Sequence, residues 1–143
     1  MWLIKQIARM FCGHGDDVLP PPSGVVDYVQ AKKLLNNATV GGVYINAITV
    51  QDTNSMLPVF DAGDLILITK DFEHCELTVG DIIIYQGHGT TIIHRIIEIN
   101  ETPDGGRVYT CKGDANGGKD PYYILDEHII WLFTGVIHCR KEI

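Results

Sequence analysis

The chain from Gly42 onwards consists of short runs rich in Val, Ile, Thr and Tyr, separated by turn-forming residues. Runs of this length and composition favour β-strands, because β-branched and aromatic side chains pack well on a pleated surface. They predict six strands, near residues 43–50, 64–69, 82–86, 91–100, 107–112 and 129–138. A chain of 143 residues has room for one core of this kind, so we expect a mainly β domain.

The sequence Pro103-Asp104-Gly105-Gly106 separates two of these runs and predicts a hairpin turn. Glycine supplies, without a steric penalty, the positive φ that tight hairpin turns require. The hairpin would pair the strand at 91–100 with the strand at 107–112. This pairing is a physical reason to expect His94 close to Asp114.

Two short helices are expected ahead of the strands. In residues 1–11 the apolar side chains fall on one helical face, and a Pro-rich linker follows at 13–23. A second helix is expected from Gly24, with Ser23 as its N-cap and Asn36-Asn37 as its stop. The chain would therefore divide into an N-terminal part, residues 1–41, and a β domain, residues 42–143.

Residues 1–12 support two interpretations. In the first they form a helix packed on the domain, and in the second an interfacial helix that contacts a membrane through Trp2 and Phe11. We favour the packed helix, because one helix of about three turns anchors weakly. The segment lacks the apolar core and cleavage site of a signal peptide, and no run of the chain reaches the roughly 18 to 20 apolar residues that span a bilayer.

Charge and metal-ligand patterns exclude several classes of partner. Eighteen acidic and eleven basic residues give a net charge of -7, which argues against a nucleic-acid surface. The four cysteines form no C-x-x-C pair, and the six histidines show no paired ligand spacing. We therefore expect neither a metal ion nor another cofactor.

The residues that suggest chemistry are Ser55, His94, Asp114 and Asp120. A serine hydroxyl becomes a good nucleophile when a base takes its proton, and a neutral imidazole suits this task near neutral pH. Strand alternation places His94 with Ile92 and Ile96 on one face, so we expect a half-buried ring. A carboxylate at the other ring nitrogen would stabilise the imidazolium, and either aspartate is a candidate.

Four segments together resemble the signal peptidase and LexA-like serine peptidase superfamily. They are Ser55-Met56-Leu57-Pro58 with Gly63-Asp64, Gly80-Asp81-Ile82-Ile83-Ile84-Tyr85, Ile93-His94-Arg95-Ile96-Ile97, and Lys112-Gly113-Asp114-Ala115-Asn116 with Asp120. Bacterial signal peptidases and LexA-like proteins normally carry a lysine base. The histidine in this place resembles the archaeal and endoplasmic-reticulum type of signal peptidase I.

This resemblance implies a partly open β-barrel or coiled antiparallel sheets, and a serine endopeptidase activity. Its Ser55/His94 dyad would be assisted by aspartate, with Asp120 favoured as the direct partner and Asp114 as a supporting group. The oxyanion donors would be the backbone N–H of Ser55 and the hydroxyl of Thr53, with Asn54 as a competitor for the second role. A peptide or protein substrate would bind as an extended strand and be cut after small residues.

The chain departs from membrane-bound members of that family, because Asn and Gly residues interrupt the stretch at 34–51 that precedes the serine. One alternative is a LexA-like protein that cleaves itself, for which Cys12-Gly13 is the candidate bond. Another is a catalytically silent module of the same fold that binds a peptide or protein. The sequence does not fix the compartment, whether cytoplasmic or peripheral to a membrane.

Overall fold

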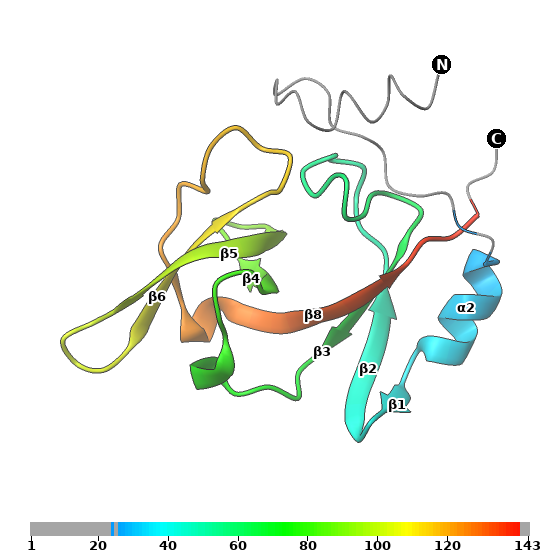
Figure 1. Ribbon diagram of the computed structural model, residues 1–143, viewed down its shortest axis with the longest axis horizontal. Coiled ribbons are helices and arrows are strands. Elements are labelled where there is room, and N and C mark those ends of the chain that lie inside the picture. Colours follow the sequence, from blue (N-terminus) through cyan, green and yellow to red (C-terminus); the bar gives the residue numbers. More distant parts are fainter. Residues whose placement is uncertain (1–23, 25, 141–143) are drawn as a thin grey trace, which may run out of the picture.

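The computed structural model describes residues 24 and 26–140, which form one helix and one eight-stranded antiparallel sheet (Figure 1). The elements are α2 (Tyr28–Leu35), β1 (Ala38–Val40), β2 (Val43–Ile48), β3 (Leu65–Thr69), η1 (His74–Glu76), β4 (Ile82–Gln86), β5 (Thr91–Glu101), β6 (Arg107–Lys112), β7 (Ile124–Leu125), η2 (Asp126–His128) and β8 (Ile129–Ile137). The strand order is β1-β2-β3-β8-β4-β5-β6-β7. The mainly β prediction is confirmed, and within the described residues the sheet stays open rather than closing into a barrel.

The last strand, β8, joins the two halves of the sheet. It pairs with β3 on one side and with β4 on the other, and Figure 1 shows it curving between them. Chain segments at 65–69 and 82–86 thus become part of one sheet without pairing directly. The loop that carries Ser55 lies between β2 and β3, and β8 and β4 lie between β3 and β5, the strand that carries His94.

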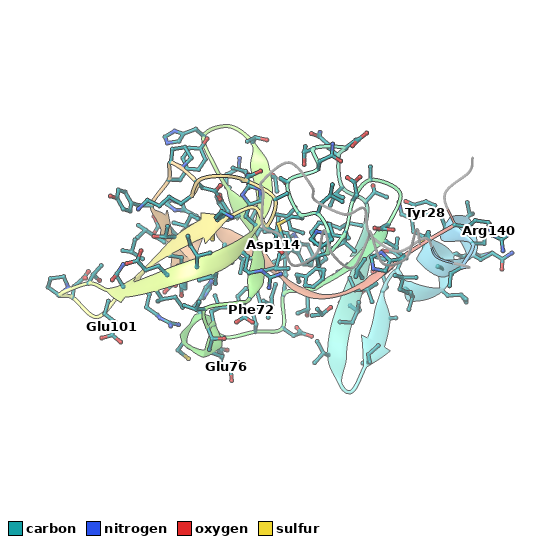
Figure 2. All side chains as sticks on the ribbon, turned by 45° about the horizontal axis from the view of Figure 1, so that its top comes forward. Tyr28, Phe72, Glu76, Glu101, Asp114 and Arg140 are labelled. Atoms are coloured by element: carbon teal, nitrogen blue, oxygen red, sulfur yellow. The ribbon has the colours of Figure 1, made fainter. Side chains whose placement is uncertain are left out.

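All six predicted strands are present, and the predicted hairpin joins β5 to β6. Glu101 pairs with Arg107 next to the turn, and Gly105 has the expected positive φ of 86°. Figure 2 shows Glu101 near the tip of this long hairpin, away from the rest of the sheet. The sequence analysis missed β1 and β7, which have three and two residues. Such short runs carry too little periodicity to predict a strand.

The expected start of the helix near Gly24 is wrong. The helix α2 begins at Tyr28, and its N-cap is Asp27, whose carboxylate accepts a hydrogen bond of 2.9 Å from the backbone N–H of Gln30. Val26 instead forms a parallel bridge with Cys139, after the end of β8. A Cβ at Gly24 would lie 1.3 Å from the backbone oxygen of His138, so this close approach requires glycine.

The end of the helix is as predicted, with Asn36 as its C-cap and Asn37 at a positive φ of 64°. The proposed Ser23 cap, the Pro-rich linker and both interpretations of residues 1–12 lie outside the described residues. Within the described part of the chain, no helix has the length and apolarity needed to span a membrane.

Three clusters of buried apolar side chains form the core. The first contains Leu77, Ile83, Tyr85, Ile96, Tyr109, Cys111, Ile124 and Ile129. The second contains Met56, Phe60, Ile66, Ile68, Ile82 and Ile84, and the third contains Ala31, Ala47, Leu65 and Cys139. Consecutive residues of β4 alternate between the first and second clusters, so this strand is buried on both faces. Strand β4 is therefore a fixed support for its neighbour β5.

Candidate active site

His94 lies on β5, where its strand neighbour is Ile83 of β4. Its ring is buried, with 9% of the residue exposed, and its Nδ1 lies 2.7 Å from Oδ2 of Asp120. Ile92 and Ile96 on the same face pack in the first cluster, while Ile93 packs against the second, as the alternation predicted. A carboxylate at Nδ1 holds the ring in one orientation and favours the tautomer with its proton there.

The two candidate carboxylates occupy different environments. Asp120 is 8% exposed and bonds to His94, whereas Asp114 receives hydrogen bonds from Nε and Nη2 of Arg95, at 2.8 and 2.7 Å. This two-point pairing with Asp114 raises the pKa of the Arg95 guanidinium. The sequence analysis favoured Asp120 as the direct partner of the imidazole and Asp114 as a supporting group. The geometry gives Asp120 the contact with the imidazole and gives Asp114 a partner on the other face of β5.

Ser55 lies in the loop between β2 and β3, immediately before a turn that is anchored in the core. Met56 and Phe60 are each 2% exposed, and the backbone N–H of Phe60 donates to the oxygen of Met56. The hydroxyl oxygens of Ser55 and Thr53 lie 3.1 Å apart. Asn54 between them has a positive φ of 58°, so the backbone reverses just before the serine.

Hydrogen-bond donors near Ser55 remain available for a ligand. Within the described part of the chain, no partner is found for the backbone N–H of Ser55. The Thr53 hydroxyl contacts only the Ser55 hydroxyl among the described side chains. These are the two groups that the family resemblance marks as oxyanion donors, and no comparable contact of the Asn54 side chain with Ser55 is seen in residues 26–140.

The loop that follows β6 holds Ser55 in place. The backbone N–H of Ala115 donates a 2.9 Å hydrogen bond to the backbone oxygen of Ser55. A Cβ at Gly113 would lie 2.7 Å from that same oxygen and 2.7 Å from Nδ2 of Asn116. Only glycine fits at this contact, so residues 113–116 and the serine loop are matched in shape.

We expect Gly113→Ala to push the two loops apart. Overpacking of this kind should lower the free energy of unfolding by about 1–3 kcal/mol. Displacing the serine should also lower kcat/KM for a peptide substrate by about 10²-fold. Thermal unfolding and steady-state kinetics measure the two effects.

Gly117→Ala is the matched control, since a Cβ at Gly117 would meet no atom of the described residues within 4 Å. It should behave as the parent does. Equal behaviour of the two variants would contradict the close fit between residues 113–116 and Ser55.

A cavity of about 680 Å³ connects these groups. Its polar lining includes Thr53, Ser55, His94 and Asn116, and its apolar lining includes Ile48, Val50, Ile84 and Ile93. The volume lies in the range that accommodates a short stretch of peptide. No hydrogen bond joins Ser55 to His94 among the described residues, so the two side chains share the cavity without being in contact as donor and acceptor.

Similarity to known proteins adds a second line of observation. No protein-family model matches the chain. A signal peptidase I W of Bacillus subtilis (strain 168) is 34% identical over 84 residues, which are 58% of this chain and 44% of that protein. The human signal peptidase complex catalytic subunit SEC11C is 34% identical over 75 residues, 51% of this chain and 38% of that protein. The chain is similar to these signal peptidases over about half of its length.

The Dictyostelium discoideum signal peptidase complex catalytic subunit sec11 is also similar, with 36% identity over 75 residues, 51% of this chain and 41% of that protein. The resemblance to signal peptidases, drawn from the four sequence segments, is therefore confirmed. The chain spans about two fifths of the length of these signal peptidases. Activity, substrates and partners of the whole protein therefore belong to the proposal below.

Three residues have contacts in the candidate site that the sequence analysis did not anticipate. Gly113 permits the loop contact, Asn116 lines the cavity, and Tyr85 donates a 2.6 Å hydrogen bond to Oδ2 of Asp120. A tyrosine within an apolar strand is usually a core residue, and Tyr85 is also fully buried. Its hydroxyl had no sequence signal that would connect it to Asp120.

The three cysteines in the described part of the chain do not provide a competing nucleophile in the cavity. Cys75 is exposed, whereas Cys111 and Cys139 are buried, and all three are free thiols. Burial, and next the nearby Asp120 carboxylate, raises the pKa of the Cys111 thiol to about 12. That thiol stays protonated and unreactive near neutral pH.

Proposed function

We propose that the chain is a serine endopeptidase of the signal peptidase type, with Ser55 as nucleophile, His94 as general base and Asp120 as the group that orients the base. One observation carries the proposal. His94, whose Nδ1 lies 2.7 Å from Oδ2 of the buried Asp120, lines the same cavity as Ser55. The relationship to signal peptidases supports peptide cleavage as the reaction class.

The proposed reaction begins when Nε2 of His94 takes the proton of the Ser55 hydroxyl and Oγ attacks the scissile carbonyl carbon. The negative charge then moves to the carbonyl oxygen, where the N–H of Ser55 and the hydroxyl of Thr53 donate to it. His94 gives its proton to the leaving amine, and the C–N bond breaks. Water, activated in the same way, releases the acyl group from Ser55.

Asp120 favours this sequence of steps because it is next to the ring nitrogen that stays protonated throughout. Its negative charge stabilises the imidazolium that forms when Ser55 loses its proton, and this offsets the cost of creating a charge at a buried ring. Contact between Ser55 and His94 would form when substrate enters the cavity, since catalytic hydrogen bonds often tighten only in the substrate complex.

We infer that the substrate binds as an extended strand along the cavity. Residues 48–51, at the end of β2 and just after it, form one wall, and residues 89–93, just before β5 and at its start, form the other. An extended peptide between such segments uses main-chain hydrogen bonds for affinity and side-chain pockets for selectivity. The signal peptidase relationship supports small residues just before the cut.

A library of unstructured peptides tests the proposal. The parent protein and its Ser55→Ala and His94→Ala variants would each be incubated with the library, with detergent or lipid present, and new peptide ends identified by mass spectrometry. We expect the parent alone to cut, after small residues. If none of the three folded proteins cuts any peptide, the proposal is overturned and a catalytically silent binding module is favoured.

Self-cleavage is the alternative activity, and its candidate bond, Cys12-Gly13, lies outside the described residues. The intact mass of the parent protein after prolonged incubation shows whether this bond has been cut.

A further inference from the structure

Asp120 is held from two sides at a single oxygen. Its Oδ2 receives a hydrogen bond of 2.6 Å from the hydroxyl of Tyr85 and lies 2.7 Å from Nδ1 of His94. Tyr85 is on β4 and His94 on β5, where Tyr85 pairs with Ile92 and Ile83 pairs with His94. Residues related in this diagonal way share one face of the sheet and are within reach of each other's long side chains. The strand register therefore brings both donors to the same carboxylate.

The Tyr85 hydroxyl keeps its proton and so remains a hydrogen-bond donor. Tyr85 is fully buried, and burial together with the hydrogen bond to Asp120 raises its pKa well above the ordinary tyrosine value. Its hydroxyl stays protonated over any pH at which a peptidase is assayed. An O–H donor to a buried carboxylate forms one of the stronger hydrogen bonds in proteins.

Other ionisable groups near Tyr85 and His94 do not replace the Tyr85 hydroxyl as a partner of Asp120. The Cys111 thiol is neutral, since its pKa is raised to about 12, and the backbone oxygen of Cys111 accepts from the N–H of Asp120 at 2.8 Å. Tyr122 also packs against the first cluster, which contains Tyr85. Arg95 on β5 donates its Nε and Nη2 hydrogen bonds to Asp114 and not to Asp120. In the described part of the chain, Tyr85 and His94 are the only side chains that hydrogen-bond to Asp120.

We propose that Tyr85 is a positioning residue that tunes His94 through Asp120. Its hydroxyl fixes the carboxylate orientation and, by sharing Oδ2, weakens the attraction of that oxygen for a protonated imidazole. The inference rests on the proposed function for its catalytic meaning, while the network itself can be measured in a protein without activity.

Tyr85→Phe removes the hydroxyl and leaves the ring in the core. With one donor fewer, Oδ2 holds a protonated His94 more strongly, so the base becomes free only at higher pH. We expect the acid-side midpoint of the pH profile of kcat/KM to rise by about half a pH unit, about a threefold change in proton affinity. The plateau should fall by no more than about tenfold, because the nucleophile and base both remain.

Tyr109→Phe is the matched control. Tyr109 is also fully buried in the first cluster, and its hydroxyl donates at 2.7 Å to a carboxylate, Asp126, that has no contact with His94 in the structure. This variant also loses a tyrosine–carboxylate hydrogen bond, in this case a partly buried one outside the site, and the same hydroxyl lies 3.3 Å from the backbone oxygen of His74. It should lose stability to a similar degree and keep the midpoint of the parent.

An NMR titration of the His94 ring makes the test independent of turnover. In Tyr85→Phe the midpoint of the ring titration should rise, in Tyr109→Phe it should stay, and Tyr85→Phe added to Asp120→Asn should change nothing further. An unchanged or lowered midpoint in Tyr85→Phe would overturn the inference. If the parent cuts no peptide but the midpoint still rises, the proposed function fails and the role of Tyr85 toward His94 stands.

Discussion

Ser55→Ala is expected to lower kcat/KM for a cleaved peptide by about 10⁴-fold or more, because the reaction loses the atom that bonds to the substrate. The substitution removes one oxygen from a half-buried side chain, whose only side-chain hydrogen bond within residues 26–140 is to Thr53. The fold should therefore be retained, with a melting temperature close to that of the parent. Steady-state kinetics with the preferred peptide, together with thermal unfolding, measures both effects.

The chain contains one other serine, Ser23, and Ser23→Ala is the natural control for this experiment. It should keep the activity of the parent. The double variant Ser55→Ala/His94→Ala should be no worse than Ser55→Ala alone, since a base without a nucleophile has nothing to activate. Additive losses from the two substitutions, or full activity of Ser55→Ala, would contradict a dyad that works as a unit.

Asp120→Asn is expected to lower kcat/KM by about 10²- to 10⁴-fold while changing the shape of the side chain little. The amide carries no charge to stabilise a protonated His94. Its NH₂ group can also turn toward Nδ1, which would favour the tautomer that presents a proton rather than a lone pair to Ser55. Loss of the charge-assisted contact with Tyr85 adds to the effect.

The control for Asp120 is Asp126→Asn, because Asp126 also accepts a hydrogen bond from a buried tyrosine, at 2.7 Å from Tyr109. This variant should remain fully active. Comparable losses in the two variants would show that the effect follows from disturbing a tyrosine–carboxylate pair in general, and the role assigned to Asp120 would then be wrong.

The strands and the β5–β6 hairpin were predictable because their signals are local. β-Branched runs and the turn at 103–106 specify strand and reversal within a few residues. The start of α2 was not predictable, because Val26 bridges Cys139 more than a hundred positions further along the chain. A contact so distant in sequence leaves no periodic pattern. The helix was therefore predicted to begin at Gly24, whereas Gly24 and Val26 lie beside residues 138–140.

The candidate site likewise contains residues that the sequence predicted and contacts that it did not. The four polar residues of the candidate site were proposed from their sequence context, and the structure contains the contact favoured there between Asp120 and His94. The role of Arg95 as the partner of Asp114 depends on which face of β5 each side chain takes and on where the 113–116 loop returns. Tyr85 depends on the register between β4 and β5, since a shift of one residue would turn its hydroxyl away from Asp120. Register is set by the whole sheet, so sequence patterns alone do not reveal these two contacts.

Trapping of a covalent intermediate tests the central claim most directly. A peptide ester with a small residue before the cut would be mixed with the parent protein, quenched in acid during turnover, and the digested protein mapped by mass spectrometry. Esters acylate serine enzymes readily, so the acyl-enzyme should accumulate. We predict a single adduct on Ser55 with the mass of the acyl part of the substrate, and none in Ser55→Ala. An adduct on another side chain, such as the exposed Cys75, or ester turnover that persists in Ser55→Ala, would contradict the assignment of Ser55 as the nucleophile.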